Sequence, residues 1–262
     1  QYYGALSIGS TIYYATFIVE WRLLNGLPYS TYNLHSVGSY DMETEEQQTI
    51  FTDRQMVAMG DINGTLHVIF YNSEVSPQTY SLEKWNGERF ENVKTFPAGG
   101  GDLLEINGGT FVYDEAANTI YMGMRNLAGD TESAAWYFDL DNSLELTKTG
   151  GTSDVNYYFV KCDDGIYVTG YRNTAGEDED EHYEAYIFKP TNPGNWNFST
   201  ENKQVFDNAM FTNPAYDPVR NVIYGFNDNE TLVTYDIAAQ AFSGGIWVNS
   251  GLYGIIPINQ NN

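Results

Sequence analysis

The stretch Tyr216–Tyr224 reads YDPVRNVIY, and Tyr113–Tyr121 repeats it as YDEAANTIY. Both copies have the form Y-D-x-x-x-N-x-I-Y, in which one extended segment ends at Tyr-Asp and the next begins at Ile-Tyr. Asp and Asn side chains can hydrogen-bond the backbone of a tight turn, so we interpret each copy as a β-hairpin. A hairpin that recurs along a chain indicates a repeat architecture.

Weaker copies of the second strand of this hairpin form a series along the chain. The members are Ile12-Tyr13-Tyr14, Leu66-His67-Val68, Ile120-Tyr121-Met122, Ile166-Tyr167-Val168 and Ile223-Tyr224-Gly225. They begin 54, 54, 46 and 57 residues apart, and the wrap from Ile223 through the C-terminus to Ile12 gives 51. A period of about 50 residues built from strands and turns is the mark of a β-propeller. The sequence therefore predicts one all-β domain over residues 1–262, a five-bladed propeller with four-stranded antiparallel blades.

The two ends of the chain are expected to share the closing blade. Leu252–Ile258 is an extra apolar segment, and we predict that it joins the blade containing Tyr2–Leu24. Such closure removes exposed sheet edges. The alternative is an incomplete sixth blade.

The first and fourth units carry specific expectations for their strands and loops. In the first unit, Thr11–Phe17 and Val19–Leu24 are expected as separate strands, and Pro28–Leu34 as a plausible outer strand. The acidic run Asp41–Gln48 is then interpreted as a solvated loop that joins blades. In the fourth unit, the final strand is expected near Trp196–Ser199.

The net charge limits the partners. With 35 acidic and 12 basic residues, the formal charge is −23 at pH 7. Such a surface repels phosphate backbones and anionic lipid headgroups, so we expect no nucleic-acid partner. No apolar run approaches the roughly 18 residues of a membrane span, so no membrane insertion is expected. The alternative is that the acidic surface serves only to keep the protein soluble.

The blades resemble the broad group of kelch-like and YncE-like propeller repeats, in which Tyr-Asp, a turn, Asn and Ile-Tyr precede an aromatic-Asp strand. The matching residues are Tyr113, Asp114, Asn118, Ile120 and Tyr121 with Phe138 and Asp139, and Tyr216, Asp217, Asn221, Ile223 and Tyr224 with Tyr235 and Asp236. The match covers two blades well. No Gly-Gly pair follows the second strand as in true kelch repeats, and no Trp-Asp closes a blade as in WD repeats. The resemblance implies a fold and no reaction.

A second local repeat supplies candidate ligand-binding residues. Arg125–Glu132 reads RNLAGDTE and Arg172–Glu179 reads RNTAGEDE, each where a second strand ends. In a propeller the loops that follow lie on one face, and the corresponding loop of the second unit is Asn72–Thr79. Guanidinium groups present planar donor forks to a ligand, so the predicted contacts are Arg125, Asn126, Arg172, Asn173 and Asn72. The alternative is that each Arg pairs with neighbouring carboxylates.

Calcium is the one cofactor candidate. The run EDEDE at Glu177–Glu181 offers hard oxygen ligands, with Glu177, Asp178 and Asp180 as the candidate residues. It lacks the spaced Asp-x-Asp-x-Asp-Gly pattern. The alternative is a solvated loop with no metal.

Catalysis by a glycoside hydrolase would require carboxylates that converge on the central channel, at least one with a raised pKa. Asp61, Asp114, Asp164 and Asp217 recur at corresponding hairpin turns. Recurrence in successive blades favours a role in the turns. Cys162 has no His at a suggestive spacing and is interpreted as a buried or half-buried residue.

These observations favour a non-catalytic binding or interaction module that contacts carbohydrate, or else a protein, through the face built by the loops after each second strand. A glycoside hydrolase and a structural component of a surface assembly are the alternatives. Low Cys content, acidity and abundant Tyr, Asn and Gly favour an extracytoplasmic location.

Overall fold

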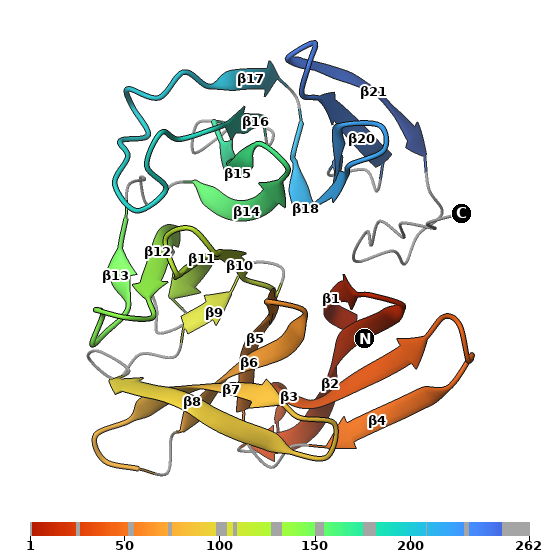
Figure 1. Cartoon of the computed structure of the whole chain (residues 1–262), viewed down its shortest axis with the longest axis vertical. Coiled ribbons are helices and arrows are strands. Elements are labelled where there is room, and N and C mark those ends of the chain that lie inside the picture. The colour runs from red at the N-terminus through yellow and green to blue at the C-terminus, as the bar shows by residue number, and fades with distance from the viewer. Residues whose placement is uncertain are drawn as a thin grey trace.

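The computed structural model describes residues 2–24, 27–51, 55–72, 75–97, 104–106, 109–126, 133–149, 155–174, 182–207, 209–227 and 231–247. These residues form five antiparallel sheets arranged around a common centre (Figure 1). In four of the sheets the strands follow chain order, and in the third sheet a short additional strand, Leu104–Ile106, pairs with Thr119–Asn126 beside Val112–Asp114. The inner strands of consecutive sheets contact one another from the first sheet to the fifth. The five-bladed β-propeller predicted from the sequence is thereby confirmed.

Each blade contains a four-stranded meander that runs from an innermost to an outermost strand, and blade 3 has a fifth, short strand outside this meander. Blade 1 contains β1 (Tyr2–Ile8), β2 (Thr11–Leu24), β3 (Leu27–Asp41) and β4 (Gln47–Phe51), and blade 2 contains β5 (Gln55–Ile62), β6 (Thr65–Asn72), β7 (Thr79–Trp85) and β8 (Phe90–Pro97). Blade 3 contains β9 (Leu104–Ile106), β10 (Val112–Asp114), β11 (Thr119–Asn126), β12 (Ser133–Asp139) and β13 (Thr147–Lys148). Blade 4 contains β14 (Asn156–Cys162), β15 (Gly165–Asn173), β16 (Tyr183–Phe188) and β17 (Gln204–Asp207), and blade 5 contains β18 (Thr212–Asp217), β19 (Val222–Phe226), β20 (Thr231–Asp236) and β21 (Ala241–Trp247).

The carboxylates of the repeated hairpin serve its turn. Asp114 Oδ1 accepts the backbone N–H groups of Ala116 and Ala117 at 3.0 and 3.4 Å. Asp217 Oδ1 accepts those of Val219 and Arg220 at 2.9 and 3.1 Å. A carboxylate used in this way satisfies turn donors that no strand partner can reach. The turn role predicted for these two Asp residues is therefore confirmed.

Tyrosine and asparagine complete the same hairpin. The Tyr113 hydroxyl donates to Asn118 Oδ1 at 2.9 Å, and the Tyr216 hydroxyl lies 3.1 Å from Asn221 Oδ1. Asn118 and Asn221 have φ angles of 46° and 54°, a left-handed conformation that Asn tolerates better than most residues. The conformational demand of the turn explains why Asn recurs there.

Blade 1 differs from the prediction in three ways, the first of which is that Pro28–Leu34 belongs to β3, an inner strand of the blade, and β4 is the outer strand. Thr11–Leu24 is one continuous strand that pairs along its length with β3, from Thr11↔Asp41 to Leu24↔Leu27. The acidic run Asp41–Gln48 does not join blades. It forms the turn from β3 to β4, where Asp41 N donates to Glu46 O at 2.9 Å and Asp41 Oδ1 accepts the N–H groups of Glu43 and Thr44. The side chain of Asp41 therefore closes a hairpin within the blade.

Blade 4 takes its outer strand from Gln204–Asp207 and not from the segment near Trp196. Trp196 and Phe198 are each 6% exposed and lie against Tyr157, which faces them at ring-centroid distances of 5.5 and 5.8 Å. Burial of two large aromatic side chains draws this segment onto the sheet face, so it cannot continue the edge. The expected strand near Trp196–Ser199 is wrong for this reason.

Apolar clusters lie at successive boundaries between blades. Ala15 and Val37 of blade 1 pack with Met59 and Phe70 of blade 2. The next boundaries are formed by Tyr80 and Phe96 with Phe138, by Tyr121 with Tyr157 and Val168, and by Val160 and Tyr167 with Phe211 and Ile223. Face-to-face packing of this kind holds blades that share no strand pairs.

The expected sharing of the closing blade concerns Leu252–Ile258, which lies outside the described residues. Blade 1 has four strands of its own, all contributed by residues 2–51. Among the described residues, none forms a helix with the length and apolar character needed to cross a bilayer.

Candidate functional site

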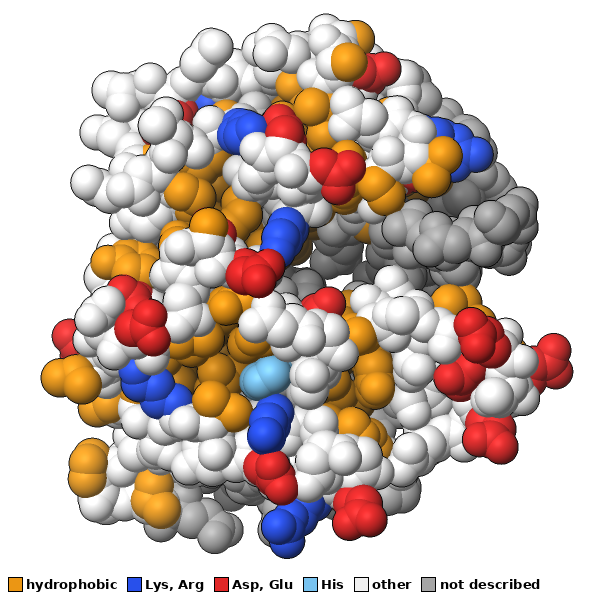
Figure 2. Space-filling view, in the orientation of Figure 1, with side chains coloured by type: hydrophobic (Ala, Val, Ile, Leu, Met, Phe, Trp, Pro, Cys, Tyr) orange, Lys and Arg blue, Asp and Glu red, His pale blue; other side chains and the backbone are white. Residues whose placement is uncertain are grey.

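A cavity of about 800 Å³ opens where the innermost strands of all five blades converge. Its walls include Leu6 from β1, Asp61 from β5, Tyr113 from β10, Lys161 from β14 and Tyr216 from β18. The cavity is bordered by turns that join first to second strands, among them Asn63-Gly64 and Glu115. We call the side of the propeller that carries these turns the turn face. Figure 2 shows this face hollowed near its middle, with acidic and basic side chains close to the hollow.

The turns of blades 2 and 3 place carboxylates at the cavity. Asp61 is the penultimate residue of β5, and its Oδ1 accepts the Gly64 N–H at 2.8 Å. Asn63 has a φ of 53°, which fits the Asn-Gly turn. Glu115 is the first residue after β10 and is exposed. Both carboxylates line the cavity while their backbones are fixed by the hairpins.

Blades 4 and 5 are joined at the cavity by one hydrogen bond. The Tyr216 hydroxyl lies 3.1 Å from Asp163 Oδ2, across the boundary between the two blades. Partial burial and the neighbouring Asp163 carboxylate raise the pKa of Tyr216. The phenol therefore stays protonated near neutral pH and can act as a hydrogen-bond donor there.

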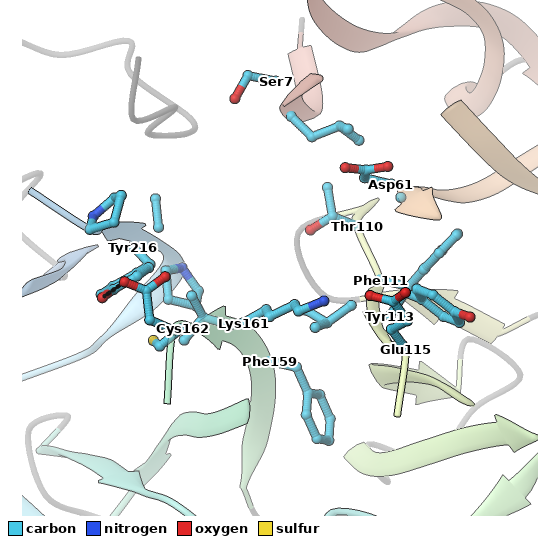
Figure 3. A pocket seen from close by; sticks show the side chains of 18 of the residues that line it. Ser7, Asp61, Thr110, Phe111, Tyr113, Glu115, Phe159, Lys161, Cys162 and Tyr216 are labelled. Carbon is cyan, nitrogen blue, oxygen red and sulfur yellow. Dashed lines mark hydrogen bonds between the residues drawn. The ribbon is translucent and has the colours of Figure 1, made fainter. Parts of the chain in front are cut away.

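Lys161 brings a positive charge to the same cavity. It is an exposed residue near the end of β14, between buried Val160 and buried Cys162. Figure 3 shows its side chain reaching towards the wall formed by Phe111 and Glu115. Across the described residues, no carboxylate lies within ion-pair distance of its ammonium group. Among the described residues that line the cavity, Lys161 thus supplies a cation without an ion-pair partner beside several acceptors.

Cys162 also lines the cavity, but its thiol is poorly suited to nucleophilic chemistry. The side chain is 5% exposed. Burial and the carboxylates of Asp164 and Asp163 raise the pKa of the Cys162 thiol far above its usual value. Because the thiolate is the reactive form, the group is inert at neutral pH.

The residues predicted to bind a ligand stand at the opposite end of the blades. Asn72, Asn126 and Asn173 are the last residues of β6, β11 and β15, with Arg125 and Arg172 one residue earlier in their strands. Antiparallel strand order puts all these strand ends on the side of the propeller opposite the turn face, which we call the loop face. The five residues therefore share the loop face, and Asn72, Arg172 and Asn173 are not among the residues that line the cavity.

Arg172 is engaged within its own blade. Its Nη2 lies 3.2 Å from Glu184 Oε2, which also accepts the Tyr186 hydroxyl at 2.6 Å. Arg172 and Glu184 are cross-strand partners of β15 and β16, and the guanidinium lies over the Tyr186 ring at 5.6 Å. The sequence alternative of a paired Arg fits this residue, although its partner is on the next strand and not in the loop.

Of the other loop-face candidates, Asn72 and Asn173 form hydrogen bonds within the protein, and the side chains of Arg125 and Asn126 lie outside the described residues. Asn72 Nδ2 donates to Thr79 Oγ1 and Ser81 Oγ at 3.3 and 3.4 Å, and Asn173 Oδ1 accepts the His182 N–H at 3.3 Å. Arg125 pairs through its backbone position with Ser133 and Glu105.

The calcium candidates Glu177, Asp178 and Asp180 lie outside the described residues. In the part of the chain that the structure describes, three or more His, Cys, Asp or Glu side chains nowhere come together in a group that could hold a metal ion.

Sequence reasoning missed the site residues Lys161, Asp163 and Tyr216. Each lies within two residues of a turn between a first and a second strand, or inside the repeated motif itself. Because five first strands must surround the channel, residues near these turns are the ones that meet at its mouth. Closeness to the first turn of a blade is therefore the sequence signal for a position at the cavity, whereas the predicted site was based on the loops after the second strands.

Comparisons with known proteins agree with this fold. No family model matches the chain, and no curated protein matches its sequence. A solved DUF4784 family protein from Bacteroides caccae is similar with a TM-score of 0.51 at 11% identity, over 92% of this chain and 61% of that one. A chain in the crystal structure of the mitotic checkpoint complex is similar with a TM-score of 0.51 at 9% identity, over 94% of this chain and 80% of that one.

This chain therefore spans less than two thirds of the length of the DUF4784 protein. At such identities the likeness concerns the fold alone. Fold and comparisons together define the class: this chain is a β-propeller.

Proposed function

We propose that this propeller is a non-catalytic binding module and that its ligand, a hydroxyl-rich saccharide, occupies the cavity at the turn face. The observation that supports the proposal is the convergence of side chains from separate blades on one cavity of about 800 Å³, a size typical of small-molecule sites. Asp61, Asp163 and Tyr216 supply acceptors and a donor, and Lys161 supplies a charged donor.

This mixture suits sugar hydroxyl groups. A carboxylate oxygen accepts from neighbouring hydroxyls, and an ammonium group donates to hydroxyl or ring oxygens. A saccharide with at most one charge also avoids the repulsion that a polyanion would meet from a chain of formal charge −23. Saccharide binding agrees with an extracytoplasmic location, which is part of the same proposal.

The test is a glycan array on the folded protein, followed by titration calorimetry with each glycan that binds. We expect saturable binding that weakens about tenfold in Lys161→Ala and in Asp163→Asn, since each loses a hydrogen bond to a charged group. Arg172→Ala is the matched control on the loop face and should bind normally. The proposal fails if Arg172→Ala abolishes binding while the cavity variants retain it, because the site would then lie on the loop face predicted from the sequence.

Calcium is tested in the same assay. The array is run with added Ca²⁺ and again with a chelator. Binding that requires Ca²⁺ would bring the run Glu177–Glu181 into the site, whereas the cavity proposal expects equal binding in both conditions.

A glycoside hydrolase is the second candidate, because carboxylates from separate blades meet at one cavity. Asp61, Glu115 and Asp163 come from blades 2, 3 and 4. A hydrolase would release reducing ends from a bound glycan, and Asp163→Asn or Glu115→Gln would stop the release. The binding module predicts bound glycan that is recovered intact.

The third candidate, a structural component of a surface assembly, requires a continuous apolar patch on the protein surface. The described part of the surface offers little support for such a patch. Large apolar side chains with exposed fractions of 37% or more are Tyr40, Val75, Val93, Leu144, Val205 and Val219, which are spread over all five blades. A protein partner remains an alternative occupant of either face, since propellers commonly bind proteins.

A further inference from the structure

Among the basic residues whose side chains the structure describes, almost all are engaged by the protein itself. Of its 12 Lys and Arg residues, Arg22, Arg54 and Arg125 have side chains outside the description, which leaves nine. Lys84 and Arg89 pair with Glu91, Arg172 with Glu184, Lys189 with Asp164 and Arg220 with Asp217. Lys94 donates to Leu140 O, Lys203 donates to Phe198 O, and Lys148 also has a partner.

Lys161 is the exception among these nine. Its ammonium group has no partner among the described residues, in a chain with nearly three acidic residues for each basic one. Its position is fixed from both sides, since Val160 and Cys162 are 6% and 5% exposed in the boundary with blade 5. The side chain reaches into the cavity from this anchored strand (Figure 3).

The cavity limits which anion could meet that ammonium group. The carboxylates of Asp61, Glu115 and Asp163 line the same space and repel a second negative charge. A phosphate, with a charge of about −1.5 to −2 near neutral pH, meets more of this repulsion than a single carboxylate does. The same acidic side chains accept hydrogen bonds from hydroxyl groups. A ligand with one carboxylate among several hydroxyls satisfies both requirements.

We propose that Lys161 binds the carboxylate of an acidic saccharide, a glycan ending in a uronic acid, while the surrounding carboxylates accept its hydroxyl groups. This inference rests on the proposed function, and it specifies the ligand class of the same cavity. The ammonium–carboxylate contact is a charge-assisted hydrogen bond, so it should favour the acidic sugar over its neutral counterpart by about 10- to 100-fold.

The experiment compares two oligosaccharides that differ only in a terminal glucuronic acid or a terminal glucose, by calorimetry on the full chain. We expect the acidic glycan to bind at least about tenfold more tightly. Lys161→Gln should reduce the two affinities to the same value, and Lys161→Arg should retain the preference. Lys84→Gln is the matched control, because it removes a lysine of blade 2 that is paired with Glu91 outside the cavity. Thermal unfolding of each variant checks that the fold is intact.

Other outcomes overturn one proposal or both. Equal affinity for the two glycans in the wild type, or a preference that survives Lys161→Gln, overturns the role of Lys161 and leaves saccharide binding standing. Inorganic phosphate that competes as well as glucuronate shows a general anion site and overturns the inference. If neither glycan binds, the proposed function and this inference fall together.

Discussion

Tyr216 and Asp163 are joined by a hydrogen bond of 3.1 Å that links blade 5 to blade 4 at the mouth of the channel. The same hydroxyl lies 3.1 Å from Asn221 Oδ1 within its own turn. Tyr113, the equivalent residue of blade 3, donates only to Asn118 among the described contacts. Both tyrosines line the cavity, but only the hydroxyl of Tyr216 also lies within hydrogen-bond distance of a residue of the neighbouring blade.

The roles of the two tyrosines can be distinguished by substitutions that remove their hydroxyl groups. Tyr113 is 7% exposed, and Tyr113→Phe removes the hydroxyl that donates to Asn118 Oδ1, so we expect a loss of about 1 kcal/mol in the free energy of unfolding. Tyr216→Phe should cost less stability, because its hydrogen bonds are exposed to water. Urea unfolding followed by circular dichroism measures both.

For ligand binding, the expected effects of the two substitutions have the opposite order. Both tyrosines line the cavity, but the Tyr113 hydroxyl is committed to Asn118 within its own turn, whereas the Tyr216 hydroxyl lies beside Asp163 between two blades. Tyr216→Phe should therefore weaken glycan binding, while Tyr113→Phe should leave binding within about twofold of the wild type. Equal effects of the two variants on binding would contradict the assignment of Tyr216 to the site.

The motif that identified the fold did so because its residues are required by local geometry. Asp114 and Asp217 satisfy turn N–H groups, Asn118 and Asn221 accept a left-handed backbone, and none of these demands depends on distant parts of the chain. These demands recur in full in blades 3 and 5 and so leave a pattern that can be read along the sequence. The number of blades followed from the spacing of that pattern.

Features set by contacts between distant residues were predicted less well. The outer strand of blade 4 was misplaced because Trp196 and Phe198 fill a space between sheets, which strand propensity does not reveal. The candidate site was predicted on the loop face from the repeated Arg-Asn pairs. Arg172 proved to pair with Glu184, a partner 12 residues away whose cross-strand register is set by the sheet. Lys161 became a candidate only once five inner strands were placed around one cavity.

Gly60 illustrates how closely the inner strands approach. A Cβ atom at this position would lie 2.3 Å from Cε2 of Phe111, whose ring is 5% exposed between blades 2 and 3. Phe111 is held there by its N–H, which donates to Met59 O at 3.0 Å. Gly60→Ala should therefore lower the free energy of unfolding by about 1–3 kcal/mol, measured by urea unfolding.

A double-mutant cycle checks the cause. In the Phe111→Leu background, the added methyl group meets a smaller side chain, so the cost of Gly60→Ala should shrink by at least about 0.5 kcal/mol. Strictly additive effects of the two substitutions would show that the added methyl group does not strike the ring.

Cys162 should be silent towards thiol reagents in the native state. Its thiol is 5% exposed and its pKa is raised, first by burial and then by Asp164 and Asp163. At about pH 8 we expect no reaction with Ellman's reagent in native buffer, and release of one thiol per chain in guanidinium chloride. Rapid reaction of the native protein would show an accessible thiolate and would reopen a nucleophilic role for this residue.

The pairing of Asp217 with Arg220 predicts a pH-dependent contribution to stability. Burial opposes ionisation of Asp217, but hydrogen bonds from the Arg220 side chain and from two backbone N–H groups outweigh it, so the Asp217 pKa lies below its usual 3.8. A lowered pKa means that the ionised form stabilises the folded state. That contribution is fully present above pH 3.8 and is lost as the pH falls through the folded-state pKa.

Asp217→Asn keeps an oxygen for the turn N–H groups but loses the charge that meets Arg220 Nη1 at 2.8 Å. The variant should be less stable than the wild type by about 1 kcal/mol at neutral pH, and the difference should vanish in strong acid. Urea midpoints measured from neutral pH down to about pH 3 follow the change. Arg220→Gln removes the other partner and should show the same convergence. A difference that stays constant over this range would mean that the turn geometry, and not the charge on Asp217, accounts for its effect.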